Sequence, residues 1–173
     1  QKAHPECIKI LKYAEVQLAA LANNHIMDYG TQGVIDTLDL CKSNGIETLG
    51  IGNTPDEARK PFSKAIKGKN IAIFNFADDE FISTQEKSFF CSPALTDQML
   101  TAILQARNNH DFIIVIIHGG NEFYELPSPR IKSLYRILVD SGADAIISHH
   151  THAFSGYEIY KSKPIFYGLG NFI

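Results

Sequence analysis

The sequence predicts an α/β fold built as a single domain over residues 1–173. Stretches with the apolar spacing of amphipathic helices alternate with short apolar runs that are typical of strands. These runs are apolar throughout, which favours a sheet buried on both faces with helices packed against it. No internal repeat, linker or low-complexity tract divides the chain, and 45% of its residues are hydrophobic, enough for one core.

Each element is predicted from its own pattern. The helices at 31–44 and 94–109 place Val34, Leu38 and Cys41, and Leu95, Met99, Ile103 and Ala106, on single faces. Thr31 is a plausible N-cap for the first of them, and Asn44-Gly45 is a stop signal. The predicted elements, in order, are a helix at 4–14, a strand at 16–22, a helix at 31–44, a strand at 46–52, a helical turn closing at 58–61, a strand at 70–77, a polar loop at 78–93, a helix at 94–109, a strand at 111–120, a helix from Pro127 to Ser141 with Leu134, Ile137 and Leu138 inward, a strand at 143–152 and a hairpin at 156–172 turning at Ser162-Lys163.

Charge and composition argue against several classes of protein. The chain has sixteen basic and nineteen acidic residues and no Lys/Arg run, so no nucleic-acid-binding surface is indicated. No apolar stretch reaches the roughly 18–20 residues needed to span a bilayer, and no signal peptide is visible. Three widely spaced cysteines without a CxxC pair predict reduced thiols rather than a disulfide framework or a zinc-thiolate site.

Polar residues gather just past the ends of three predicted strands. Asn24-His25 follows the strand at 16–22, His118 ends the strand at 111–120, and His150 and His152 end the strand at 143–152. In open α/β sheets the carboxyl ends of the strands form the edge where ligands bind. Neutral imidazole is the commonest protein ligand for mid-row divalent metals, so these residues predict a metal site at that edge.

His150 and His152 are separated by one residue. In an extended segment such residues point to the same side, so both imidazoles could face one metal pair, whereas His149 would point the other way, to pack against the protein or to hydrogen-bond a group behind a ligand. The alternative is a histidine-rich loop that binds no metal. A position directly after an apolar strand favours the metal site.

His118 is followed by Gly119-Gly120, which lets the backbone turn sharply or approach a ligand closely. A single histidine at a strand end often only hydrogen-bonds its neighbours. The polar residues after the other two strands favour a metal-ligand role for His118. Glu122 stays open between a metal ligand, an acceptor for a histidine N–H, a general acid or base, and a solvated loop carboxylate.

Asn24 and His25 combine an amide oxygen, which can bind a metal, with an imidazole that could protonate a leaving group or hold an anionic oxygen. Asn23 could instead bond the local backbone, as asparagine does in turns. Asp28 has the pattern of a turn or cap residue, with a metal role as the alternative.

Other catalytic motifs are weak. Residues 168–172 (GLGNF) resemble a phosphate-binding loop only superficially because no helix follows, and Asn171 lies either near the site or in a structural turn. No G-x-S-x-G elbow is present. These patterns therefore leave the histidines as the main candidates for chemistry.

The segments 21–52, 116–152 and 156–172 carry a resemblance that covers nearly the whole chain. ANNH-x-x-D-x-G, HGG-x-E and HH-x-H resemble the bacterial capsule-synthesis CapA family, which includes polyglutamate-capsule proteins of the PgsA type and is related to the calcineurin-like metallophosphoesterases. Thr151 stands where the family often has proline.

The resemblance implies a metallophosphoesterase-like four-layer α/β/β/α sandwich with two divalent metal ions (Mn, Fe, Zn or Mg). By similarity, Asn24, His118, His150 and His152 are metal ligands, and His25 is an acid near the leaving group, with Glu122 as a further catalytic candidate. It also implies that the opening strand, with the glycine-aspartate motif of the first metal Asp, and the segment after Asn171-Phe172 lie outside this sequence.

Two functions follow as alternatives. The first is a metal-dependent hydrolase that acts on an anionic polymer or a phosphoester in capsule or exopolymer biosynthesis, the polymer being poly-γ-glutamate or a polysaccharide. The second is a non-catalytic accessory component of a polymer synthesis and export complex at a membrane, because a fold does not fix a function. Family members are often membrane-anchored or extracytoplasmic, and a cytoplasmic location is equally open.

Overall fold

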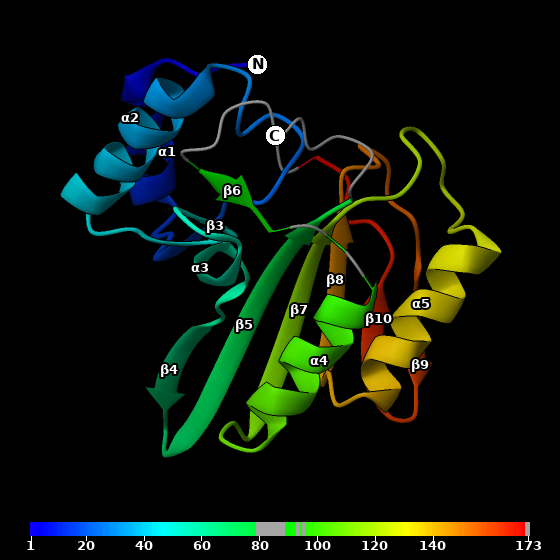
Figure 1. Ribbon diagram of the computed structural model, residues 1–173. Coiled ribbons are helices and arrows are strands. Elements are labelled where there is room, and N and C mark those ends of the chain that lie inside the picture. The colour runs from blue at the N-terminus through cyan, green and yellow to red at the C-terminus, as the bar shows by residue number, and fades with distance from the viewer. Residues whose placement is uncertain (79–88, 93, 95, 172–173) are drawn as a thin grey trace.

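The computed structural model describes residues 1–78, 89–92, 94 and 96–171 (Figure 1). The helices are η1 (Pro5–Cys7), α1 (Ile8–Tyr13), α2 (Gly30–Ser43), α3 (Pro55–Arg59), α4 (Thr96–Arg107) and α5 (Pro129–Asp140). The strands are β1 (Leu18–Ala20), β2 (Glu47–Leu49), β3 (Ile51–Gly52), β4 (Phe62–Ile66), β5 (Lys69–Ala77), β6 (Phe90–Cys91), β7 (Phe112–His118), β8 (Ala145–His149), β9 (Tyr157–Tyr160) and β10 (Lys163–Phe166). None of the helices in these ranges is long and apolar enough to cross a bilayer.

A mixed sheet organises the molecule. In the described part of the chain it has six strands in the order β4-β5-β7-β8-β10-β9. β5, β7, β8 and β10 run parallel, and β4 and β9 pair antiparallel at the two edges. The register pairs Ala77 with His118 and His118 with His149. The carboxyl ends of β5, β7 and β8 therefore lie side by side at one edge of the sheet.

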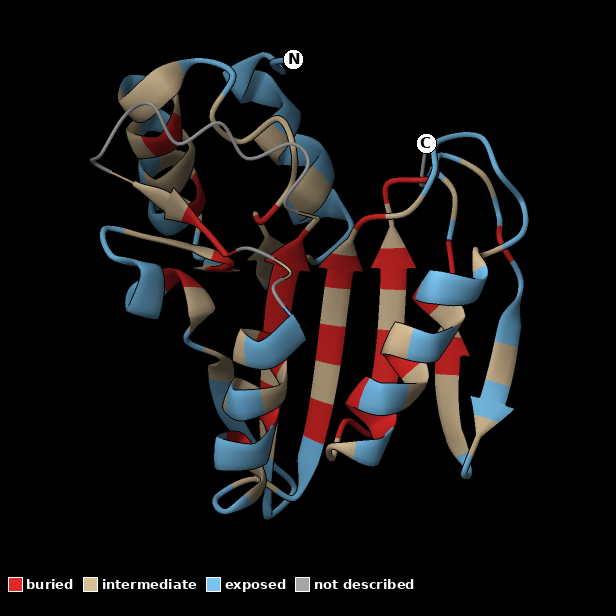
Figure 2. Cartoon of the chain, turned by 45° about the vertical axis from the view of Figure 1, so that its right-hand side comes forward, coloured by how far each residue is buried: buried red, intermediate tan, exposed pale blue. Residues whose placement is uncertain are grey.

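One face of this sheet is covered by α4 and α5, which lie side by side against it (Figure 1). Alternation along β7 sets the packing, because Ile113, Val115 and Ile117 are buried under the helices while Ile114 and Ile116 are only half-buried on the other face. Figure 2 shows this alternation as bands along the central strands. The large, fully buried side chains of this core include Phe74, Phe76, Met99, Ile103, Tyr135, Leu138, Ile146 and Ile165.

The opposite face carries a second, small sheet at its upper end. β1 and β2 pair in parallel, and α2 packs against β2. Ala22, just past β1, donates its backbone N–H to Asn75 Oδ1 of β5 at 2.7 Å. Gly50 has φ +91°, and a Cβ placed there would lie 2.4 Å from the same oxygen, so only glycine fits. The structure is thus a mixed α/β fold, with helices on one face of a multi-strand sheet and a small parallel sheet with α2 near the end of β5, which confirms the predicted α/β class.

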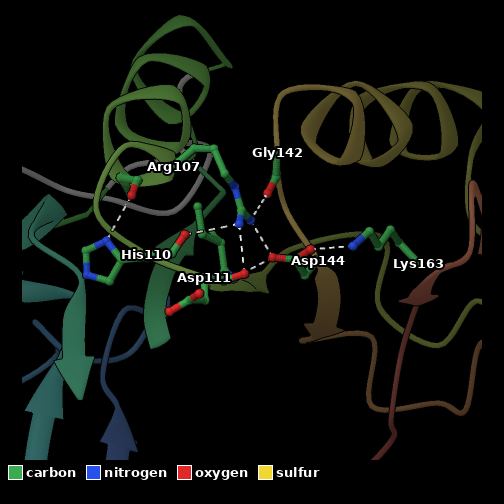
Figure 3. A network of polar contacts seen from close by, with 8 residues as sticks. Arg107, His110, Asp111, Gly142, Asp144 and Lys163 are labelled. Carbon is green, nitrogen blue, oxygen red and sulfur yellow. Dashed lines mark hydrogen bonds and ion pairs between the residues drawn. The ribbon is translucent and has the colours of Figure 1, made fainter. Parts of the chain in front are cut away.

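The amino edge of the main sheet is closed by a charged network (Figure 3). Asp144, at the entrance to β8, accepts hydrogen bonds from Arg107 of α4, from Lys163 of β10 and, at 2.8 Å, from the backbone N–H of Ile113. Arg107 also donates to the carbonyl oxygens of Gly142 and Asp111. This network joins three strands and a helix at the end of the sheet opposite the histidines.

Several predicted details are wrong. α2 begins at Gly30 after Tyr29, and no side chain caps it, so Thr31 is not the N-cap. The strand predicted at 46–52 is split at Gly50 into β2 and β3, which join different sheets. Leu138 is buried as predicted, but Ile137 is 45% exposed, because Tyr135 lies on the inner side of α5 instead.

Other expectations are confirmed, and some fall on residues that the structure does not describe. Met99, Ile103 and Ala106 are buried on α4, whereas the inward placement of Leu95 and most of the loop at 78–93 fall outside the described residues. Strand β4 was not predicted, although positive φ values at Lys67 and Gly68 mark the tight turn that joins it to β5. The final hairpin turns at Lys161-Ser162, one residue earlier than predicted.

Candidate metal centre

The predicted histidines lie at the carboxyl ends of neighbouring parallel strands, at one edge of the main sheet. His118 is the last residue of β7 and His149 the last of β8, and the two are paired in register. His150 follows directly, and Asn24 arrives from the loop after β1. The predicted meeting of distant segments at the carboxyl edge therefore occurs.

Three potential ligand atoms converge at this edge. His118 Nε2 lies 2.9 Å from Asn24 Oδ1 and 3.1 Å from His150 Nδ1. Ligand atoms that bind one ion at about 2.1 Å and about 90° to each other are about 3.0 Å apart, so these spacings suit a shared cation as well as hydrogen bonding. Two imidazole nitrogens and an amide oxygen form a mixed donor set that fits a borderline or hard divalent ion.

The electrostatics keep these imidazoles neutral. Burial, reinforced by the neighbouring His149 and His150, lowers the pKa of His118 to about 3. Burial also lowers the pKa values of His149 and His150. Each ring is therefore neutral at pH 7 and keeps one nitrogen lone pair, the state required of a metal ligand.

His150 is the most enclosed of the set, with a side chain only 1% exposed. Its Nε2 lies 3.8 Å from a carboxylate oxygen of Glu122, on the loop after β7. Glu122 itself is exposed. The structure thus brings Glu122 to the rim of the cluster, on the side of His150 away from His118.

His152 lies beside the convergent set. The backbone has positive φ at His150 (106°) and His152 (55°), so the segment is not extended and the expected two-residue alternation does not apply. The rings of His150 and His152 are 6.2 Å apart between centroids. His152 Nδ1 is 2.8 Å from Asn171 Oδ1, and its ring stacks on Phe123 at 5.8 Å. Asn171 therefore lies near the site, one of the two options the sequence left open.

The loop after β1 is ordered by its own polar residues. Asn23 Oδ1 accepts the backbone N–H of His25 at 2.8 Å, and its amide donates to Leu21 O, which confirms the predicted turn role. His25 Nδ1 lies 2.8 Å from Asp28 Oδ2, so Asp28 orients this imidazole. The His25 side chain is 39% exposed, accessible to a bound molecule.

Asp78 and Arg130 lie beside the candidate site and were not predicted from the sequence. Asp78 directly follows β5, and its backbone N–H donates to His118 O at 2.8 Å. Its carboxylate is 3.8 Å from Arg130 at the start of α5, and a Cβ on Gly119 would lie 3.3 Å from that carboxylate. Its position at the end of an apolar strand, the criterion that identified His118, was the available signal.

Within the described ranges, no group of three or more His, Cys, Asp and Glu side chains is arranged to hold a metal ion. The convergent set has two histidines and takes its third donor from the amide of Asn24. The donor atoms fit a cation, and the ligand roles of Asn24, His118, His150 and His152 stay predictions.

A search of solved structures supports the fold. A candidate 5′-nucleotidase from Staphylococcus aureus superimposes with a TM-score of 0.65 at 15% identity, over 98% of this chain and 38% of that one. At such low identity the likeness shows a shared fold and nothing about activity.

Sequence comparison gives the family. The capsule biosynthesis protein CapA of Bacillus anthracis is 34% identical over 99% of this chain and 43% of its own length. A probable polyglutamine synthesis accessory protein of Mycobacterium tuberculosis is 27% identical over 99% of this chain and 49% of its own length. The chain thus spans about half the length of the relatives it matches. The model of the bacterial capsule synthesis protein PGA_cap family matches residues 1–173 in full, and the chain therefore belongs to this family.

Proposed function

We propose that this chain is a metal-dependent phosphoester hydrolase domain that serves capsule or exopolymer biosynthesis. The observation that carries the proposal is the convergence of three donor atoms. His118 Nε2 lies 2.9 Å from Asn24 Oδ1 and 3.1 Å from His150 Nδ1. The neutral state of the imidazoles and the 5′-nucleotidase-like fold support the same chemistry.

The residues that would hold divalent ions (Mn, Fe, Zn or Mg) divide into two groups. Asn24, His118 and His150 would hold one ion, and His152, with its ring centroid 6.2 Å from that of His150, would serve a second. A bound pair of divalent ions supplies Lewis-acid stabilisation of phosphoryl oxygens and an activated water. The neutral rings of His118 and His150 supply lone pairs at the site without the repulsion that imidazolium cations would add.

The acid and base roles fall to residues beside the ligand set. Asp28 occupies His25 Nδ1, so the Nε2 atom of this imidazole is the one left to donate a proton to a leaving group. Glu122, 3.8 Å from His150 and exposed, would either orient that ring or accept a proton from water. Neither side chain is enclosed, so both are accessible to a bound substrate.

The family sets the biological context. The relatives are described as capsule biosynthesis and polyglutamine synthesis accessory proteins, which suggests a substrate that is an anionic polymer or a phosphoester-linked precursor of one. A polymer-synthesis complex at a membrane is the corresponding partner. A capsular polysaccharide with phosphoester links would fit this chemistry directly, whereas poly-γ-glutamate is joined by amide bonds, so for that polymer the phosphoester would belong to a phosphorylated precursor.

A second candidate is a non-catalytic accessory role in the same complex. The description of the Mycobacterium tuberculosis relative as an accessory protein favours it, as does the need for an amide to complete the three-atom set. In this role the carboxyl edge would bind polymer or a partner protein without bond cleavage.

The test compares the full-length protein with its His118→Ala variant and with His4→Ala, a control at an exposed histidine near the start of the given sequence. Calorimetric titration with Mn²⁺ and hydrolysis of bis-p-nitrophenyl phosphate are measured for each. Metal binding and turnover in the parent and control, lost in His118→Ala, support the enzyme. Metal-free parent protein without turnover contradicts it, and polymer production by cells carrying the same variant in the full-length protein would then favour the accessory role.

A further inference from the structure

His149 makes a contact that nothing in the proposed hydrolase chemistry uses. It ends β8 directly opposite His118 in the register, with the two rings 4.7 Å apart between centroids and steeply inclined at 69°. The Nδ1 atoms of the two rings are 2.8 Å apart. A separation this short between two ring nitrogens requires a hydrogen bond, because two bare lone pairs would repel each other.

The His118 ring is therefore held at both of its nitrogens by consecutive residues. His149 contacts Nδ1 at 2.8 Å, and His150 lies 3.1 Å from Nε2. Consecutive residues of an extended strand point to opposite faces, so they cannot normally grip one ring. The positive φ of 106° at His150 ends the alternation and turns its ring back. This corrects the expectation that His149 points away from the site.

Proton accounting at this pair has a direct consequence. A neutral imidazole carries one N–H, and it binds a cation through the other nitrogen. Because Nε2 of His118 faces Asn24 Oδ1 and His150 Nδ1, Nε2 is the nitrogen that would face an ion. With an ion on Nε2, the His118 proton must sit on Nδ1 and be donated to Nδ1 of His149, whose own proton sits on Nε2. Without an ion, the 2.9 Å contact with the acceptor Asn24 Oδ1 places the His118 proton on Nε2 instead. Two neutral rings share two protons in this arrangement, so no net charge is added.

We propose that His149 is a positioning residue that accepts the hydrogen bond from His118 Nδ1–H and so presents a bare His118 Nε2 to a divalent cation. This inference rests on the proposed metal site. Acceptors behind metal-binding histidines fix the ring orientation and the tautomer, and their loss lowers metal affinity about 10–100-fold. A second histidine in this role is adjustable, because it can shift its own proton between nitrogens.

The experiment separates hydrogen bonding from packing. In His149→Asn the amide oxygen takes the place of Nδ1 and can accept the same bond, whereas His149→Phe keeps the ring volume and removes the acceptor. His4→Phe is the matched control on an exposed histidine. Mn²⁺ affinity is measured by calorimetry for each, and ¹⁵N NMR of the Zn²⁺-loaded protein reports which His118 nitrogen carries the proton.

We expect His149→Phe to lose about 10–100-fold in Mn²⁺ affinity, and His149→Asn and His4→Phe to stay close to the parent. The His118 proton should be on Nδ1 in the parent and in His149→Asn. Equal affinities for His149→Phe and the parent, or a His118 proton on Nε2 in the loaded parent, would overturn the inference while leaving the proposed metal site intact. If the parent binds no metal, both proposals fall together.

Discussion

Replacing Asp144 by asparagine tests what holds the amino edge of the sheet together. The Asp144 side chain is 8% exposed and accepts from two cations and one backbone N–H (Figure 3). Asparagine keeps an oxygen for the Ile113 N–H but removes the charge that faces Arg107 and Lys163. Hydrogen bonds to charged groups contribute about 1.5–3 kcal/mol each. The two cations are 34% and 39% exposed, so water takes over part of that interaction.

We therefore expect Asp144→Asn to lower the free energy of unfolding by about 2 kcal/mol rather than by the sum of two such bonds. With a denaturant slope of about 2 kcal/mol per molar, the urea midpoint falls by about 1 M. Asp144→Ala also leaves the Ile113 N–H without its acceptor, and should cost about 3–4 kcal/mol. Asp56→Asn, which breaks a surface ion pair with Arg59, is the matched control and should shift the midpoint little.

The pH dependence gives an independent check. Burial alone would raise the pKa of Asp144, but Lys163 and Arg107 outweigh it and hold that pKa below the ordinary value of 3.8. A carboxyl with a depressed native pKa stabilises the fold above its unfolded pKa, and this contribution disappears as the pH falls through the native pKa. The gap between parent and Asp144→Asn should thus be complete at pH 7 and shrink below about pH 4. Equal urea midpoints at pH 7, or a gap that stays constant down to pH 3, would refute this account.

Three further outcomes follow from local geometry. Gly50→Ala should cost about 3 kcal/mol in urea unfolding, because its Cβ meets an oxygen at 2.4 Å on a left-handed backbone, whereas Gly45→Ala, with φ +73° and open space, should cost about 1 kcal/mol. Burial raises the pKa of Tyr135 to about 12, so absorbance at 295 nm should show this phenol still neutral at pH 10.5 until the protein unfolds. Burial also raises the pKa of the Cys91 thiol to about 12. Ellman's reagent should therefore label exposed Cys7 rapidly and Cys91 only in denaturant.

The parts of the fold that follow from local pattern were predictable. β7 is a β-branched run whose alternate residues face the helices, and Asn44-Gly45 ends α2 as expected. The strand-end rule also predicted that Asn24, His118 and His150 would meet. Each of these follows from residues adjacent in sequence plus one general property of parallel sheets.

The remaining details depend on contacts between distant segments. β3 leaves the strand that contains β2 because Gly50 turns the chain toward β6, a partner about forty residues away. β4 is largely exposed and has a weak apolar pattern, so its pairing with β5 is fixed by the turn at Lys67-Gly68. Single-sequence periodicity carries no information on such partners.

The same limit explains why the site was only partly predicted. Strand periodicity placed His149 and His150 on opposite sides, which would hold had β8 continued past His149. The structure ends the strand there, and the backbone cost of a left-handed non-glycine residue at His150 is repaid by packing, since that side chain is 1% exposed. No pattern of neighbouring residues in the sequence predicts a buried, neutral histidine with positive φ that lies 3.1 Å from another imidazole. Packing accounts for its conformation, and its position 3.1 Å from His118 is why the proposed metal site rests on this residue more than on the predicted H-x-H spacing.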